Sequence, residues 1–443
     1  MTKLSPRVRV GYALGGITSG TYGTVPGLIL MPFLTDYLGV AAGLAGLIVF
    51  APKAWDFILN PIAGRISDRS KHPTDRRRPF VIRAGALLAI VFVIIFVGPT
   101  HPPLLAGLWV LAISLASATV YAFFQVPFLS MAAEITDDYS ERTRLTTWRV
   151  AVFSIAILVS GAAAPMIVEA GGGIAGYRIM AIVMGVLILT GAVGLWLGTR
   201  GVPLTRDEQA SGKLFEQLAI VLKDRDTRGL IVCFVLQAVA IGMVLSGVVY
   251  VAKHVVNDPA ASTFAFACFV LPAVVFAPLW QRVGVRLGKK RGFIIATFVL
   301  SIGLLALVVS RTGETVLMLA AAAIVGVGYA GAQIFPLAMM PDVAAEDAKR
   351  SGVNRIGMIS GLWSGFELLG LALGPALLGI ILAIGGYAEA SGAAVQQSDS
   401  AKWAIVIGVS LVPAVLCFVS LVPLSRYRLD AKLREAADIA AGG

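Results

Sequence analysis

The sequence is poor in charged residues, and this scarcity excludes an ordinary soluble domain. Of the 443 residues, 14% are charged and 58% are hydrophobic, whereas a soluble domain has about 25% charged and roughly 45–50% apolar residues. The chain also lacks the G-x-x-x-x-G-K-[ST] loop that holds nucleotide phosphates and the H-E-x-x-H pair that binds catalytic zinc. We therefore expect neither a nucleotide-driven pump nor a zinc protease, and no enzyme, cofactor or resident metal.

Cysteine is scarce as well. The three cysteines lie inside apolar runs without C-x-x-C spacing, so neither a disulfide framework nor a zinc site is supported. The formal net charge is +11, which in a soluble protein would suggest nucleic acid. In a chain this apolar, basic residues more often set topology and contact anionic headgroups. We expect membrane lipids, and no nucleic acid, as partners.

Apolar stretches long enough to cross a bilayer are abundant. A spanning helix needs about 20 such residues. Twelve stretches qualify, near residues 10–35, 41–64, 79–99, 104–133, 146–169, 177–198, 228–252, 260–281, 292–310, 315–340, 356–386 and 402–424. Glycines spaced four residues apart, such as Gly11 with Gly15 and Gly370 with Gly374, predict close helix packing. The sequence predicts an all-α polytopic membrane protein with twelve transmembrane helices.

The loops between these stretches alternate between strongly basic and nearly uncharged. Residues 65–78 and 282–291 are rich in Lys and Arg, whereas the turn 99–103 contains neither. Because basic loops remain on the cytoplasmic side, we expect both termini to be cytoplasmic in an integral plasma (inner) membrane protein.

A long polar segment near the midpoint divides the chain into two halves. The expected parts are an N-terminal six-helix bundle, a cytoplasmic linker and a C-terminal six-helix bundle with a cytoplasmic tail, over residues 1–200, 201–227 and 228–443. Each half places a proline about two turns before an acidic helix end, Pro127 before Glu134 and Pro336 before Asp342. Two similar halves are typical of secondary transporters, although chance similarity between apolar helices is the alternative.

Few charges lie inside the apolar stretches, and each is a candidate for function because a charge in hydrocarbon is costly. They are Lys53, Asp56, Arg149 and Glu367. Lys53 and Asp56 share one helical face and can form an ion pair, with a purely structural role as the alternative. Arg149 could extend to the cytoplasmic interface. Glu367 needs a cavity, a partner on another helix, or a proton.

Several segments resemble one transporter family. In the first half they are residues 53–61 (KAWDFILNP), 125–128 (QVPF) and 134–149 (EITDDYSERTRLTTWR). In the second half they are residues 340–343 (MPDV), 352–355 (GVNR), 361–363 (GLW) and 367–374 (ELLGLALG). On these motifs the chain is identified as a member of the glycoside-pentoside-hexuronide:cation symporters, the melibiose carrier-like family of the major facilitator superfamily.

The resemblance implies a major facilitator fold and alternating-access uptake of a sugar-like solute with a cation. Together with the intramembrane charges, it gives a substrate-binding set: Lys53, Asp56, Asn60, Gln125, Arg149, Trp363 and Glu367. Asp56 would also couple the cation. A cytoplasmic gate is expected from Asp68, Arg69, Arg78, Glu134, Arg142, Arg144, Asp342 and Arg355.

The sequence departs from the family pattern at acidic positions. Asn60 stands where the family usually has a second acidic residue four positions after Asp56, and Gln125 stands at the aspartate linked to sugar and cation. Since one carboxylate remains and Lys53 lies one turn away, we expect coupling to a proton, or none, rather than to sodium.

We therefore predict a secondary active transporter of a small organic solute, with a sugar or glycoside as the leading substrate class. Two alternatives stay open from the sequence. A carboxylate-poor cavity also suits a lipid-like or amphipathic substrate, which eukaryotic relatives of the family carry. A non-transporting membrane receptor with the same fold is the other alternative.

Overall fold

The computed structural model describes residues 4–68, 77–136, 138–202, 224–351, 356–390, 395–427 and 429. Within these ranges the regular structure is entirely helical. The chain divides into two compact units, Met1–Ala210 with Ala388–Gln396 and Ser211–Tyr387 with Gln397–Gly443. Most of the expected linker, 201–227, lies outside the described residues, so the three predicted domain boundaries stay a prediction.

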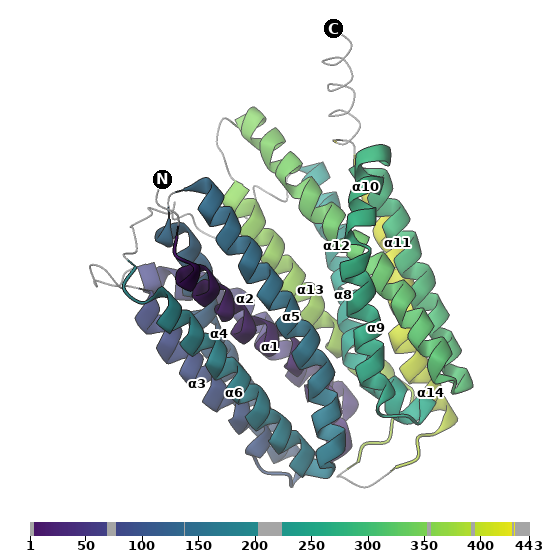
Figure 1. The fold of residues 1–443 in the computed structure, drawn as a ribbon. Coiled ribbons are helices and arrows are strands. Elements are labelled where there is room, and N and C mark those ends of the chain that lie inside the picture. Colours follow the sequence, from purple (N-terminus) through teal and green to yellow (C-terminus); the bar gives the residue numbers. More distant parts are fainter. Residues whose placement is uncertain are drawn as a thin grey trace. The chain divides into compact units, whose positions relative to one another are not determined.

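The first unit consists of long helices that begin with α1 at the N-terminus (Figure 1). Its helices are α1 (Pro6–Pro32), α2 (Ala42–Asp68), α3 (Arg78–Val97), α4 (Pro103–Ile135), α5 (Tyr139–Gly171) and α6 (Gly173–Thr199). A π-helical turn, η1 (Phe33–Tyr37), extends α1. Helix α1 packs against α5 and α6, α2 packs against α4, and α3 packs against both α4 and α6. Proline at the first or second position of α1, α3 and α4 suits these helix starts, because its missing N–H would be unbonded there anyway.

Glycine in α1 allows close helix packing in the first unit. A Cβ placed on Gly11 would lie 2.4 Å from the Cα of Gly198 in α6, and one placed on Gly16 would lie 2.9 Å from the carbonyl oxygen of Arg149 in α5. Side chains at these positions would prevent the backbones from meeting. The expectation of close packing through glycine is confirmed for this helix. Gly23 has nothing within 4 Å of such a Cβ, so α1 leaves space on one side.

The second unit contains both regular and irregular helices. They are α8 (Arg225–Tyr250), η2 (Val251–Val256), α9 (Ala261–Val275), α10 (Ala277–Leu287), α11 (Lys289–Ala306), η3 (Leu307–Thr312), α12 (Thr315–Ser351), α13 (Ile356–Ile384), α14 (Asp399–Val406), η4 (Ile407–Leu411) and α15 (Val412–Ser425). Segments η2 and η4 are π-helical and η3 is a 3-10 helix. Helices α9 and α10 meet at an angle of 45°.

Each of the twelve apolar stretches coincides with a described helix or with consecutive helical segments. The interpretation of residues 282–291 as a loop is wrong, because α10 and α11 cover this segment on either side of Gly288. In the described part of the chain, ten helices are long and apolar enough to cross a membrane, or eleven if the α9–α10 pair is one span. Helix α1, rich in Gly and Thr, is not among them, so twelve crossings stay a prediction.

Candidate functional site

Lys53 and Asp56 lie one turn apart in α2, inside the first unit. Asp56 is 5% exposed, and its Oδ1 atom has no hydrogen-bond partner. The amine of Lys53 extends toward α1, 3.7 Å from where a Cβ on Gly27 would lie. Among the described ion pairs there is none between Lys53 and Asp56, so the direct pair that the spacing allowed is absent and the charges interact at longer range. A buried carboxylate oxygen without a partner is costly unless a ligand or proton completes it.

Polar side chains of α1 and α4 lie near this carboxylate. Ser19 donates a hydrogen bond to Oε1 of Gln125 at 2.5 Å. The rings of Tyr22 and Tyr121 pack with centroids 4.5 Å apart, and both phenols are within electrostatic reach of Asp56. The first unit thus gathers hydroxyl and amide groups beside Asp56. The sequence identified the amide but missed Ser19 and the two tyrosines.

Asn60 and Arg149, the remaining predicted binding residues of this unit, are both half-buried. Asn60 follows Asp56 by one turn of α2. The backbone of Arg149 lies at the contact between α5 and α1. Its guanidinium and the Asp56 carboxylate both act electrostatically on the Tyr121 phenol. That shared neighbour indicates that Arg149 and Asp56 face one region of the unit.

A second polar group lies inside the second unit, around Glu367 of α13. Glu367 contributes to the wall of a cavity of about 270 Å³ between α8, α11, α12 and α13. The amide of Gln333 in α12 donates one hydrogen bond to the Tyr329 hydroxyl at 2.7 Å and one to Oε1 of Glu367 at 3.3 Å. Glu367 therefore has both a cavity and a partner on another helix, two of the three solutions that the sequence left open. Gln333 and Tyr329 were missed, because neutral polar residues in a helix carry no comparable signal.

Trp363 lies one turn before Glu367 and is buried. Its ring stacks on Phe234 of α8 with centroids 4.5 Å apart, and its Nε1 has no hydrogen-bond partner. Gln237, also in the cavity wall, donates to Thr297 Oγ1 at 3.0 Å, while its own Oε1 has no partner. The second unit thus offers an indole donor and an amide acceptor as well as the Glu367 carboxylate.

The predicted gate residues of the first unit centre on a buried ion pair. Arg77 Nε and Nη2 donate to Oε1 of Glu134 at 3.0 and 2.9 Å, and Arg77 Nη1 donates to Ser67. Both charged side chains are at most 3% exposed. The sequence named Arg78 for the gate, but its neighbour Arg77 holds Glu134, and Arg78 donates to the carbonyl oxygen of Val202.

Two further arginines of the predicted gate lie at the start of α5. Arg144 donates to Glu141 at 3.1 Å, and Arg9 of α1 binds the same carboxylate through two hydrogen bonds of 3.1 and 3.0 Å. Arg142 donates to the carbonyl oxygen of Thr136 at 3.2 Å. Glu141 and Arg9 thus join a charged cluster for which the sequence named only the arginines of α5.

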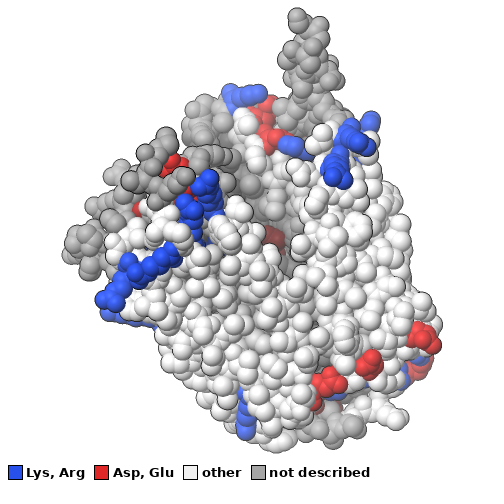
Figure 2. Space-filling view, in the orientation of Figure 1, with Lys and Arg blue, Asp and Glu red and all other residues white. Residues whose placement is uncertain are grey.

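The second unit has a comparable ion pair. Lys289 at the start of α11 donates to Asp342 of α12 at 2.6 Å, with side chains 37% and 23% exposed. Figure 2 shows blue Lys and Arg side chains at this end of the second unit, where α10 ends and α11 begins. Of the other predicted gate residues, Arg69 and Arg355 lie outside the described residues, and only the backbone of Asp68 is described.

Comparisons with known proteins agree with the helical architecture. A model of the family described as MFS/sugar transport protein matches residues 11–431. The isoprimeverose transporter of Lactiplantibacillus pentosus is 24% identical over 434 residues, covering 95% of this chain and 88% of the relative. The sphingosine-1-phosphate transporter MFSD2B of Mus musculus is also 24% identical, over 445 residues, with the same coverage.

A solved structure supports the fold independently. The structure of a bacterial homologue of the human drug peptide transporters PepT1 and PepT2 superposes with a TM-score of 0.69 at 12% identity, covering 97% of this chain and 99% of that chain. At this identity the similarity shows the fold alone. The family match indicates a transporter rather than an enzyme. The chain belongs to the MFS/sugar transport protein family, within its glycoside-pentoside-hexuronide:cation symporters, and is an integral membrane secondary transporter with the major facilitator fold.

Proposed function

We propose that this transporter carries a sugar or glycoside by alternating access, and that Asp56 lies at the centre of its binding site. The observation that carries the proposal is the buried Asp56 carboxylate with an unpartnered oxygen. Intramembrane charges of this kind are expensive and usually functional. Tyr22, Tyr121 and Gln125 add hydroxyl and amide groups that donate and accept hydrogen bonds.

The second unit has polar groups of its own that suit a sugar. Glu367, Gln333 and the unpartnered Nε1 of Trp363 are suited to hydrogen bonds with hydroxyl groups. The relative named as an isoprimeverose transporter supports a sugar-like substrate. Asn60 and Arg149 complete the proposed set in the first unit.

We propose that transport is coupled to a proton, or is uncoupled, and that sodium does not drive it. A hard cation needs several oxygen ligands, and negative charge among them compensates for its lost water. Asp56 is the one acidic residue of α2 before its cytoplasmic end, and the positive charge of Lys53 lies one turn away. A proton needs no coordination shell, so a single carboxylate suffices. Asn60→Asp should add the missing ligand and create a sodium response.

The proposed gate lies at the cytoplasmic end of each unit, with both termini on that side of the plasma (inner) membrane. The pairs Arg77–Glu134 and Lys289–Asp342 would hold helix ends together and the Glu141 cluster would tie α5 to α1. Neutralising Glu134 and Asp342 together should increase labelling of cavity cysteines from the cytoplasmic side. Unchanged labelling would leave both pairs with a structural role only.

Uptake by purified protein in proteoliposomes tests the function directly. A panel of glycosides should include at least one solute that accumulates under an imposed proton gradient, and Asp56→Asn should abolish accumulation while preserving downhill exchange. Asp399→Asn, the same substitution at a side chain 72% exposed, is the matched control and should retain accumulation. Loss of accumulation in both variants, or in neither, would contradict the assignment of Asp56.

A lipid-like or amphipathic substrate is the second candidate, favoured by the similarity to a sphingosine-1-phosphate transporter. The same proteoliposomes separate the two candidates. Competition of glycoside uptake by an excess of other glycosides but not by lysolipids favours the first, and flux of a labelled lysolipid without glycoside uptake favours the second.

A further inference from the structure

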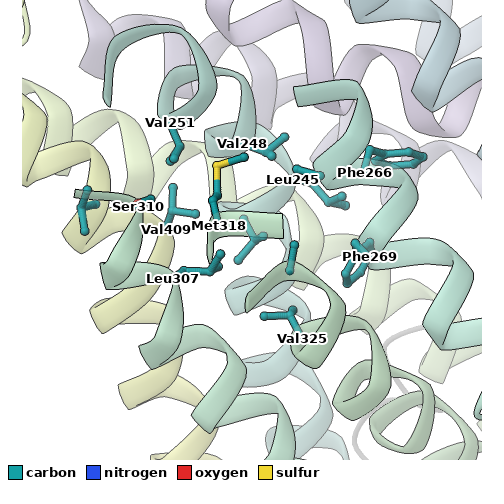
Figure 3. Close-up of a pocket in the computed structure, with 14 residues that line it drawn as sticks. Leu245, Val248, Val251, Phe266, Phe269, Leu307, Ser310, Met318, Val325 and Val409 are labelled. Carbon is teal, nitrogen blue, oxygen red and sulfur yellow. The ribbon is translucent and has the colours of Figure 1, made fainter. Parts of the chain in front are cut away.

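We propose that the second unit binds the hydrocarbon chain of an anionic membrane amphiphile in an apolar pocket separate from the Glu367 cavity. This pocket contains about 560 Å³ of empty space and lies among α8, α9, α12 and the irregular segments η2, η3 and η4. Figure 3 shows side chains that enclose it, including Val248, Phe269, Met318 and Val409.

The chemistry of the walls selects the occupant. Of the lining residues, Ser310 alone carries a polar side chain, and the rest are aliphatic, aromatic or methionine side chains. A cavity of this composition offers water too few hydrogen-bond partners, so such cavities stay dry and accept apolar molecules. In a protein surrounded by bilayer, the hydrocarbon available at high concentration is the lipid chain. A sugar or a hydrated ion would lose its hydrogen bonds there.

The irregular helical segments of the second unit meet at this pocket. Val251 begins η2, Leu307 and Ser310 belong to η3, and Val409 belongs to η4, and all four line the space. Single-turn π-helical segments inside α-helices occur frequently at functional sites. Protein interiors normally pack to the density of organic crystals, so an apolar gap where three irregular segments converge is a place that a hydrocarbon chain from the membrane can fill.

A positive charge next to the pocket selects the headgroup. Ser310 precedes Arg311, whose guanidinium pairs with Asp399 and lies 5.6 Å from the centroid of the Trp403 ring. Nε of Arg311 is buried and has no hydrogen-bond partner. Guanidinium has five donors in a fixed fork, and the side chain of Arg311 is 29% exposed. Because Arg311 directly follows Ser310 of the pocket wall, we expect an anionic headgroup on a chain in the pocket to contact its accessible donors.

The pocket is distinct from the polar cavity of the proposed transport site. The two cavities share no lining residue, although α8 and α12 contribute to both. Val244 and Val325 line the apolar pocket, and Ile241 and Tyr329, about one turn away on the same two helices, line the polar one. We therefore assign the amphiphile as a retained ligand from the bilayer, bound while the solute passes elsewhere.

Photolabelling of the purified full-length protein tests the site. A long-chain fatty acid with a photoreactive group near the end of its chain should label peptides of α9 and α12 that contain Phe269 and Met318. Ala322→Phe fills the pocket from its buried wall and should lower the labelling about tenfold. Ala320→Phe, the same change at an exposed position of the same helix, should leave it unchanged.

Further experiments identify the headgroup of the amphiphile and the kind of lipid that supplies its hydrocarbon chain. Arg311→Gln should weaken labelling by the fatty acid but not by the fatty alcohol of equal length. Native mass spectrometry of gently purified protein distinguishes a retained phospholipid from a retained free fatty acid, either of which supports the proposal. Equal labelling in wild type and Ala322→Phe, equal loss in both alanine variants, or wild-type cross-links only outside the segments that line the pocket would overturn the proposal. If Ala322→Phe does not fold, the positions of the cross-links in the wild-type protein still test the proposal.

Discussion

Substituting Glu134 by glutamine should destabilise the first unit far more than neutralising an exposed acidic residue. Arg77 makes two hydrogen bonds to Oε1 of Glu134 and one to Ser67, and the two charged side chains are 3% and 2% exposed. Glutamine keeps the shape of glutamate and an acceptor oxygen, so Glu134→Gln removes mainly the negative charge. The positive charge of Arg77 then remains buried without the negative charge of Glu134.

The magnitude follows from this burial. Removing one partner of a buried ion pair costs about 3–5 kcal/mol, because the other charge remains away from water. Asp399, the partner of Arg311, is 72% exposed, so water can replace its contact and neutralising it should cost only about 0–1 kcal/mol. Replacing both buried partners by apolar side chains, as in Arg77→Met with Glu134→Leu, should recover most of the loss because no charge is left to desolvate.

Unfolding of the purified protein in one detergent measures these differences, with stability compared among wild type, Glu134→Gln, Asp399→Asn and the Arg77→Met/Glu134→Leu double variant. We expect Glu134→Gln to be the least stable and the double variant to approach the wild type. With the single variants Arg77→Met and Glu134→Leu measured as well, the coupling energy of the two positions should exceed about 1 kcal/mol, as for residues in direct contact. Additive losses in the double variant, or equal stability of Glu134→Gln and Asp399→Asn, would refute the reasoning.

Three further predictions concern packing, topology and coupling. Gly11→Ala should destabilise by about 1–3 kcal/mol through its clash with Gly198, whereas Gly23→Ala, with open space around it, should change unfolding little. Reporter fusions after Gly172 and Gly288 should indicate the outside and the cytoplasm respectively, and the opposite result at either position would show the predicted topology to be wrong. Once a solute is known, its uptake at constant ionic strength should not change when Na⁺ replaces K⁺, and a saturable rise with Na⁺ would contradict proton coupling.

The fold was predictable because hydrophobic length alone marks helices that must satisfy their backbone hydrogen bonds internally. Helix ends were not, since a helix can continue beyond the hydrocarbon. Helix α12 runs to Ser351, well past the apolar stretch that ends near residue 340, and α10 and α11 continue through a basic segment. Charge density indicates the side of the membrane but not whether the backbone there is helical.

Charged residues of the candidate site could be predicted from the sequence. Contacts that depend on how a helix is rotated about its axis could not. Asp56 and Glu367 stand out because an acidic residue in an apolar stretch is rare, whereas Gln333 resembles any polar residue of a helix. The sequence cannot decide which of two adjacent arginines, Arg77 or Arg78, reaches Glu134, because that depends on the rotation of α3 about its axis. Lys53 shows the same limit, because its side chain extends toward α1 rather than along its own helix.

The two weakly similar halves of the sequence each have an ion pair at a corresponding place, at the starts of α3 and α11. Arg77 with Glu134 and Lys289 with Asp342 occupy corresponding helix ends, yet the first pair is buried and the second is partly exposed. Breaking a buried ion pair costs much free energy because a charge is left away from water. In an exposed pair, water replaces the lost partner at little cost. Within its own unit, each pair can be compared by the same unfolding measurement. Neutralising Glu134 should destabilise the protein more than neutralising Asp342, because the Arg77–Glu134 pair is the more deeply buried.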